Sequence, residues 1–317
     1  MKEYRSLNRR GFIKQAVALG AAGTLATLPF RTFAAPKTKR LTILHTNDVH
    51  SRIEPFPMDG SRNQGLGGVA RRATLINSIR EEEDNVLLLD AGDMFQGTPY
   101  FNLFEGKLEL ELMSKLGYEA GTFGNHEFDN GIAGLVKHLD KANFPFLTAN
   151  YDFTGTLLEG KTKEYITVEK GGIRIGITGV GIDVAGLVDP NNHKGMTYLD
   201  PIPVVNRIAK MLKEDKKCDL VICLSHLGYK YAENKVDDLK LAAASRNVDI
   251  ILGGHTHTFL DEPTRVNDLD GKEVIVNQVG FAGIRLGRLD VAFNKSTGEK
   301  NITAQHYTIG AENGLHA

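Results

Sequence analysis

Five short apolar runs that stop abruptly at polar residues constrain the fold of this chain more than any other feature. The first run, 41–44, leads into Asp48 and His50, which stand two positions apart. Residues two apart face the same side of a strand, so both side chains can reach one point where the strand ends. The other four runs lead to Asp93, to Asn125 and His126, to His226, and to His255 and His257. In an open α/β sheet such polar ends collect along one edge, where ligands bind, so we expect them to form one site.

Helix and strand patterns alternate through the first half of the chain. Val69, Ala73, Ile76 and Ile79 follow a helical spacing, which predicts an amphipathic helix within 65–80. Further helices are expected at 101–116 and 131–142, and strands at 41–44, 85–90, 119–123 and 145–150. This β-α-β-α-β-α-β order predicts a layered α/β domain.

Strands lie closer together in the second half. A Lys-Gly-Gly turn at 170–172 predicts a hairpin between strands 165–169 and 173–180. The pattern then predicts a helix at 201–213, buried strands at 220–224 and 248–252, and strands with antiparallel alternation at 274–278, 287–293 and 302–309. The longest loop, 183–200, is expected either to border a substrate or to be a plain surface excursion.

The N-terminal 35 residues have the pattern of an export signal. Adjacent arginines, Arg9 and Arg10, precede an apolar segment at 16–30 and the small pair Ala34 and Ala35. The arginine pair resembles a twin-arginine signal, which implies export of the folded protein to the periplasm or beyond. The alternative is an uncleaved anchor, but the run is shorter than the ~20 residues that span a bilayer, so no stable membrane anchor is expected. A polar linker is expected at 36–40.

Composition narrows the choice of partners. The formal net charge of −1 gives no sign of a nucleic-acid groove. The two cysteines, Cys218 and Cys223, have an odd spacing that places them on opposite faces of a strand, so we expect small core residues and no disulfide.

The order of the polar motifs resembles that of the calcineurin-like metallophosphoesterases. Asp-x-His, Gly-Asp, Gly-Asn-His-Glu, His and Gly-His-x-His occur in sequence, and His-Thr-Asn-Asp-Val-His at 45–50 is similar to the 5'-nucleotidase branch. The resemblance covers roughly 41–293. It implies an α/β fold, a four-layer α-β-β-α sandwich in which two mixed sheets face each other and helices cover the outer faces.

The resemblance also implies a site for two divalent metal ions. Asp93 would be the carboxylate between them, with Asp48, His50 and His257 at the first ion and Asn125, His226 and His255 at the second. Mixed oxygen and imidazole donors suit Mn, Zn, Fe or Co better than Mg or Ca. Some nucleotidases of this branch carry Gln at the position of His257. The histidine departs from that Gln pattern but would still supply a metal ligand.

The same resemblance gives His126 a catalytic role without metal ligation. It would protonate the leaving oxygen or stabilise its charge while hydroxide held between the two ions attacks phosphorus, and Asp129 would orient the ring. Glu127 and His45 are expected to support the site structurally. Phe281 and Ile284 are expected either to line a pocket or to pack on the core.

Four functions follow from these expectations. An exported 5'-nucleotidase-like phosphohydrolase acting on a small-molecule phosphoester, such as a nucleotide, is the first. Family members that cleave nucleotides usually have a C-terminal base-binding domain; residues 41–317 are expected to be the metallophosphoesterase domain alone, so a separate nucleotide-binding chain is one alternative. A broad or cyclic-nucleotide phosphodiesterase and a sulfur-oxidation-type thiosulfohydrolase are others. The complete ligand set argues against a non-catalytic metal-binding protein.

Overall fold

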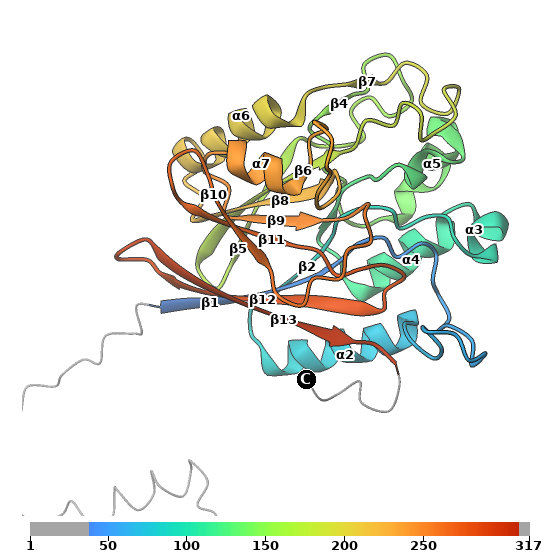
Figure 1. Cartoon of the computed structure of the whole chain (residues 1–317), viewed down its shortest axis with the longest axis horizontal. Coiled ribbons are helices and arrows are strands. Elements are labelled where there is room, and N and C mark those ends of the chain that lie inside the picture. The colour runs from blue at the N-terminus through green and yellow to red at the C-terminus, as the bar shows by residue number, and fades with distance from the viewer. Residues whose placement is uncertain (1–37, 311–317) are drawn as a thin grey trace, which may run out of the picture. The chain divides into compact units, whose positions relative to one another are not determined.

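Residues 38–310 are described by the computed structural model, and the predicted export signal lies outside them. Two mixed β-sheets lie face to face within this range (Figure 1). The five-stranded sheet has the order β13-β12-β1-β2-β3, with the bounds β1 Thr38–Thr46, β2 Val86–Asp90, β3 Ala120–Gly121, β12 Arg285–Asn294 and β13 Glu299–Thr308. The six-stranded sheet has the order β10-β11-β9-β8-β6-β5, with the bounds β5 Tyr165–Lys170, β6 Ile173–Gly181, β8 Leu220–His226, β9 Ile250–Gly253, β10 Thr264–Asn267 and β11 Glu273–Asn277.

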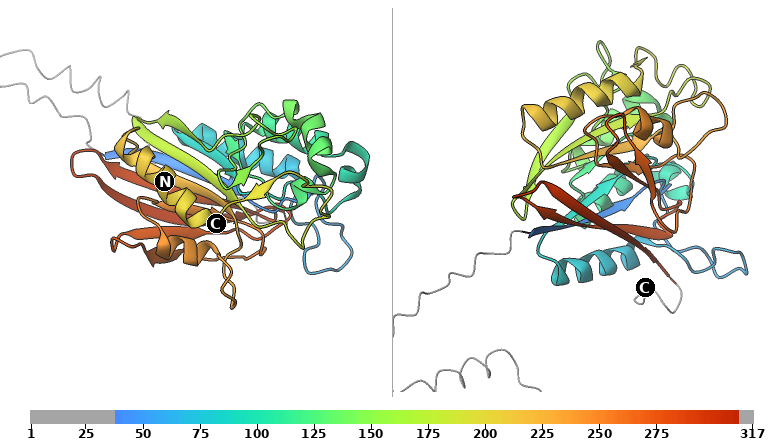
Figure 2. Two further views of the ribbon diagram at one scale, coloured as in Figure 1. Left: turned by 90° about the horizontal axis from the view of Figure 1, so that it is seen from above. Right: turned by 60° about the vertical axis from the view of Figure 1, so that its left-hand side comes forward.

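Helices cover the outer face of each sheet (Figures 1 and 2). The bounds of the helices are α2 Val69–Glu82, α3 Pro99–Phe104, α4 Lys107–Leu116, α5 Gly131–His138, α6 Pro201–Glu214 and α7 Asp238–Ala244, and two 3-10 turns are η1 His126–Phe128 and η2 Leu139–Lys141. A separate two-stranded ladder joins β4 (Tyr151–Asp152) to β7 (Thr197–Tyr198). None of the helices in the described range is both long and apolar enough to cross a membrane.

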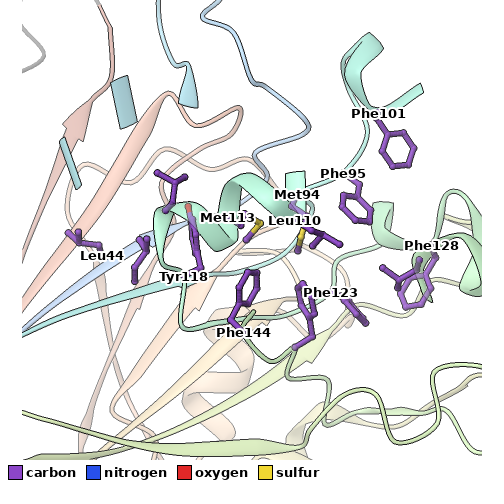
Figure 3. Packing of buried hydrophobic residues seen from close by; sticks show 14 of the residues in the cluster. Leu44, Met94, Phe95, Phe101, Leu110, Met113, Tyr118, Phe123, Phe128 and Phe144 are labelled. Atoms are coloured by element: carbon purple, nitrogen blue, oxygen red, sulfur yellow. The ribbon is translucent and has the colours of Figure 1, made fainter. Parts of the chain in front are cut away.

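Alternating side chains of the strands hold the four layers together. In β1, Leu41 and Ile43 pack between the sheets with residues of β8 such as Ile222, whereas Leu44 points the other way into the core under α2 and α4. Figure 3 shows this outer core, which includes Leu44, Leu110 and Tyr118. A third core lies between the six-stranded sheet and helices α6 and α7. The four-layer sandwich of mixed sheets is confirmed.

One predicted helix is in fact two. Residues 101–116 divide into α3 and α4 at Glu105 and Gly106, whose φ angles are 54° and 92°. The ring of Phe95 packs directly on Gly106, where a Cβ would lie 2.5 Å from the ring. The helical pattern of the sequence continues through this position. Both the left-handed backbone and the contact with the ring require a glycine there, and this glycine separates the two helices.

Other boundaries also differ from the predictions. Residues 145–150 are not a strand, because Phe146 and Leu147 form only isolated bridges to Gly121 and Lys163. Residues 38–40, expected in a linker, begin β1 and pair with β12. The strand predicted at 274–278 is β11, which runs parallel to β9 and antiparallel to β10. The sequence reading missed the short elements α7 and β10. Cys218 and Cys223 are buried free thiols, as predicted.

Candidate metal centre

The polar residues that follow five strands meet at one edge of the two sheets. β1, β2 and β3 run parallel to one another in the first sheet, and β8 and β9 run parallel in the second. Their carboxyl ends therefore deliver Asp48, Asp93 and Asn125 from one sheet, and His226, His255 and His257 from the other.

The backbone of this site is unusual. Asp48, His50, Asp93, His255 and His257 all have φ angles between 50° and 72°, in the left-handed region that side chains other than glycine rarely adopt. Each such residue costs on the order of 1–3 kcal/mol and persists only where the surroundings fix it. Here the Asp48 amide donates to the Gly92 carbonyl at 2.8 Å and the His50 amide to the Asp93 carbonyl at 3.1 Å. This strain is typical of a functional site.

The first donor group consists of Asp48, His50 and His257, whose ligand atoms lie within 4.8 Å of one another. The Nε2 atoms of His50 and His257 are 2.9 Å apart, and His257 Nε2 is 3.3 Å from Asp48 Oδ1. His50 Nδ1 faces the Phe95 carbonyl at 3.1 Å, which favours the tautomer with a lone pair on Nε2. These three donors converge as the ligands of one cation would.

The second donor group consists of Asp93, His226 and His255, again within 4.8 Å. Asn125 joins it, because its Oδ1 is 2.8 Å from His255 Nδ1. Asp93 Oδ2 lies 3.0 Å from His226 Nε2 and 3.9 Å from His50 Nε2, so its carboxylate contacts both groups. The structure thus brings all seven predicted ligands together, with Asp93 between the two sets. Their ligation of a metal stays a prediction.

His226 gives the clearest test of whether a cation fits. The ring is fully buried and its Nδ1 lies 2.7 Å from the Ala91 carbonyl. Its Nε2 lies 3.0 Å from Asp93 Oδ2 but makes no hydrogen bond of ordinary geometry within residues 38–310. Burial lowers the pKa of this imidazole, but the charges of Asp93 and Asp48 outweigh that effect and raise it to about 10. The position therefore favours a positive charge, and an unprotonated Nε2 beside carboxylates is a suitable donor for a divalent metal.

Gly124 makes room for these donors. A Cβ at this position would overlap the Asp93 carboxylate and lie 2.5 Å from His226 Nε2. Any side chain here would push both groups from their positions, so the glycine before Asn125 is a requirement of the site.

Glu127 fixes the segment that carries Asp93. Its buried carboxylate accepts four backbone N–H groups, from Asp93 and Gly124 at Oε2 and from Met94 and Phe95 at Oε1, at 2.6–3.2 Å. Burial and then the charge of Asp93 raise the pKa of Glu127 to about 8, while the four donors favour the carboxylate. A cation bound to Asp93 would offset the repulsion.

We expect Glu127→Gln to destabilise the protein by about 2–4 kcal/mol, because the amide turns its NH₂ group toward two buried N–H groups. Thermal unfolding and metal titration should show a lower unfolding temperature and weaker metal affinity. Glu159→Gln is a matched control, since this exposed carboxylate also accepts a backbone N–H, from Gly155. Wild-type stability in Glu127→Gln would contradict the anchoring role.

His45 supports the sheets and does not reach the donor groups. It is fully buried, and burial lowers its pKa to about 3, so the ring is neutral. Its Nε2 accepts a hydrogen bond from Asn277 Nδ2 at 2.9 Å, which joins β1 to β11. The structural role expected for His45 agrees with this position.

His126 and Asp129 form a pair beside the donor groups. His126 Nδ1 is 2.7 Å from Asp129 Oδ2, and the His126 ring lies edge-on to His50 with centroids 5.2 Å apart. Burial lowers the pKa of His126, but the hydrogen bond to Asp129 and the charge of Asp93 outweigh it and raise the pKa to about 9. The long loop holds the pair in place, because Asn192 Nδ2 donates to the Asp129 carbonyl at 2.7 Å.

An open pocket of about 320 Å³ lies over this edge of the sheets. Its walls include the rings of His50, His126, His257 and Phe281, together with Arg52, Phe56, Gln96, Gly97 and Ala282. Phe281 stacks on His257 with centroids 5.1 Å apart, whereas Ile284 is buried in the core. The pocket role is therefore right for Phe281 and the core role for Ile284.

Arg52 and Phe56 are pocket residues that the sequence reading missed. The Arg52 guanidinium lies 4.1 Å over the Phe56 ring, and both follow His50 in the same loop. Their nearness in sequence to a predicted ligand was the available signal. An aromatic and a cationic residue in a loop are too common to be singled out by composition alone.

Two nitrogen and oxygen donor groups around one shared carboxylate, with a histidine–carboxylate pair at the mouth, form a candidate site for two metal ions. The comparison with known families agrees: residues 41–259 match the calcineurin-like phosphoesterases. The chain belongs to this family and is a metallophosphoesterase, a phosphoric ester hydrolase by class.

Individual relatives place the chain near the 5'-nucleotidases. It is 38% identical over 275 residues to a snake venom 5'-nucleotidase of Gloydius brevicauda, covering 80% of this chain and 45% of that protein. It is 36% identical over 294 residues to the 5'-nucleotidase of Bos taurus, covering 86% and 49%. The crystal structure of a 5'-nucleotidase precursor from Thermus thermophilus superposes with a TM-score of 0.78 at 35% identity, covering 86% and 55%. The chain spans about half the length of these relatives.

Proposed function

We propose that this chain is an exported dimetal phosphohydrolase of the 5'-nucleotidase type, which cleaves phosphate esters of nucleotides or related compounds. The observation that carries the proposal is the position of Asp93, whose carboxylate contacts both donor groups beside the His126–Asp129 pair. The identity with 5'-nucleotidases over most of the described range supports the nucleotide class.

The donor set fits two divalent ions of the Mn, Zn, Fe or Co type, with Asp93 shared between Asp48, His50 and His257 on one side and Asn125, His226 and His255 on the other. When bound, such ions supply Lewis-acid polarisation of the phosphoryl oxygens and water activation at neutral pH.

The remaining steps fall to residues of the chain. Asp129 accepts a hydrogen bond from the protonated Nδ1 of His126, which leaves the Nε2–H of the charged ring available to the pocket. From there His126 can donate a proton to the leaving oxygen, a contribution of ~10²–10⁴-fold. Glu127 keeps Asp93 in position through the backbone amide groups that it accepts.

The aromatic residues in the pocket walls favour a substrate with a flat apolar part. Phe56 and Phe281 meet edge to face with centroids 6.5 Å apart, and Phe281 stacks on His257. Aromatic faces of this kind favour contact with a base or another ring.

A substrate panel tests the proposal. The metal-reconstituted protein should release phosphate from AMP faster than it hydrolyses bis-p-nitrophenyl phosphate, a cyclic nucleotide or a thiosulfate-type conjugate. Faster turnover of a diester would favour a broad or cyclic-nucleotide phosphodiesterase, and turnover of the sulfur substrate alone a thiosulfohydrolase. AMP hydrolysis that appears only after a second chain is added would indicate a separate nucleotide-binding subunit. If the protein turned over none of these substrates, the proposal that it is a phosphohydrolase would be refuted.

Export is a separate part of the proposal, since the signal lies outside the described residues. The adjacent arginines and the apolar segment at 16–30 support it. N-terminal sequencing of secreted protein should give a start near Ala34, and a start before Phe30 would exclude cleavage at that point.

A further inference from the structure

The loop that follows β9 bends around a side chain that is not a predicted ligand. Gln278, directly after β11, is fully buried. Its Nε2 donates to the Gly254 carbonyl at 2.5 Å, and its Oε1 accepts a hydrogen bond from Thr256 Oγ1 at 3.0 Å. The same oxygen also accepts from the Thr258 amide. One side-chain amide therefore holds the residues before, between and after the two predicted ligands of this loop.

These two ligands belong to different donor groups. His257 is part of the first group and His255 of the second. Both have left-handed φ angles, 53° at His257 and 72° at His255, so the surroundings must fix the shape of the loop. Gln278 makes three contacts that do so. Through one side chain it sets the spacing between a donor of each group.

A second buried amide connects the segment after Gln278 to a donor of the other sheet. Asn47 Nδ2 donates to Asp48 Oδ2 and to the Gly280 carbonyl, both at 2.6 Å. Its Oδ1 accepts from the Val279 amide at 3.0 Å. One carboxylate oxygen of Asp48 is thus fixed relative to this segment.

Main-chain hydrogen bonds complete the connection. The Gly280 amide donates to the Thr258 carbonyl at 2.9 Å. The Ala282 amide donates to the Asp48 carbonyl at 2.7 Å. The segment 278–282 leads from β11 in the six-stranded sheet toward β12 in the five-stranded sheet, and it bonds to a ligand-bearing loop of each.

We propose that Gln278 is a positioning residue that couples the two donor groups, because it fixes His255 and His257 in one arrangement. This inference rests on the proposed function, since it takes both histidines to be metal ligands. Replacing a residue that orients metal ligands commonly changes metal affinity 10- to 100-fold. A side chain that orients one ligand in each group should therefore change the affinity for both ions.

Amide hydrogen exchange in the metal-free protein tests the contacts themselves. Gln278→Met keeps the length of the side chain but cannot accept from the Thr258 amide. That amide should exchange at least ~10-fold faster than in the wild type, because the loop opens more easily. Unchanged exchange at Thr258 would show that Gln278 does not hold the loop.

Asn206→Leu is the matched control. Asn206, on α6 in the outer helical layer, donates to the Ala244 carbonyl at 2.9 Å and accepts from the Arg246 amide at 2.7 Å. It thus joins the same two kinds of backbone group at a place that holds no predicted ligand. Exchange should be faster at Arg246 and unchanged at Thr258. Both variants should lower the unfolding temperature by roughly 5 °C, through the hydrogen bonds that each loses.

Metal affinity distinguishes positioning from stability alone. The metal-free protein is titrated with Mn²⁺ and with Zn²⁺ in competition with a chelator, which should show two binding steps in the wild type. Gln278→Met should weaken both steps ~10- to 100-fold, and Asn206→Leu should weaken neither. A loss at one step alone would overturn the coupling, and unchanged affinity at both steps would overturn the positioning role.

Failure of the proposed function would give a different result. None of these measurements needs turnover, so lack of phosphoesterase activity would refute the proposed function separately. A wild-type protein that bound neither Mn²⁺ nor Zn²⁺ would refute the metal centre, and with it the coupling of two ions by Gln278. The exchange rates would still decide whether this side chain holds the loop.

Discussion

Asp93→Ala should abolish both metal binding and phosphoester hydrolysis. The Asp93 carboxylate lies 3.0 Å from His226 and 3.9 Å from His50, so its removal should affect both donor sets at once. Loss of several kcal/mol of transition-state stabilisation corresponds to a fall in kcat/KM of more than ~10³-fold. Elemental analysis of the purified variant should find less than the full metal content.

Asp84→Ala is the control for this variant. Asp84 is an exposed carboxylate just before the same strand, β2, and far from its carboxyl end. It should keep wild-type metal content and activity. Two bound metals and normal turnover in Asp93→Ala would show that this carboxylate does not join the donor groups.

His126→Ala should lose rate while it keeps its metals. His126 is predicted not to bind metal. Its ring lines the pocket and is held by Asp129, although one of its nitrogens lies within 4.8 Å of ligand atoms of His50 and Asp93. Removing a general acid costs ~10²–10⁴-fold in kcat. The loss should be greatest for esters with basic leaving groups, such as AMP, and smallest for p-nitrophenyl esters, whose leaving group needs no proton.

A histidine outside the site gives the matched control. His138, at the end of α5, contacts the exposed Glu105 at 3.7 Å, and His138→Ala should leave kcat unchanged. Equal rate loss in His126→Ala for leaving groups of every basicity would refute proton donation. Metal loss in His126→Ala would instead assign the ring to the donor set.

Much of this site was predictable because strand ends are local features. Asp48, His226 and His257 each follow a buried apolar run, and the parallel arrangement of those runs places them at one edge. The break between α3 and α4 was not predictable from periodicity, since it depends on the packing of Phe95 against Gly106. The same holds for Phe146, whose isolated bridges connect segments that are distant in sequence.

The support of the site was harder to predict than the donors. Glu127 was expected to act structurally, but its four amide contacts join residues that are more than thirty positions away as well as its neighbours. Arg72 occupies the apolar face of α2, where a charged residue breaks the helical pattern.

The donors come from both sheets, and this division has a mechanical consequence. Asp48 and Asp93 follow strands of the five-stranded sheet, whereas His226 and His257 follow strands of the six-stranded sheet. A cation bound among these donors would join the two sheets at one edge, in addition to the apolar layer that joins them along their length. Chelation should then loosen the halves against each other, and resistance to heat should rise and fall with metal occupancy.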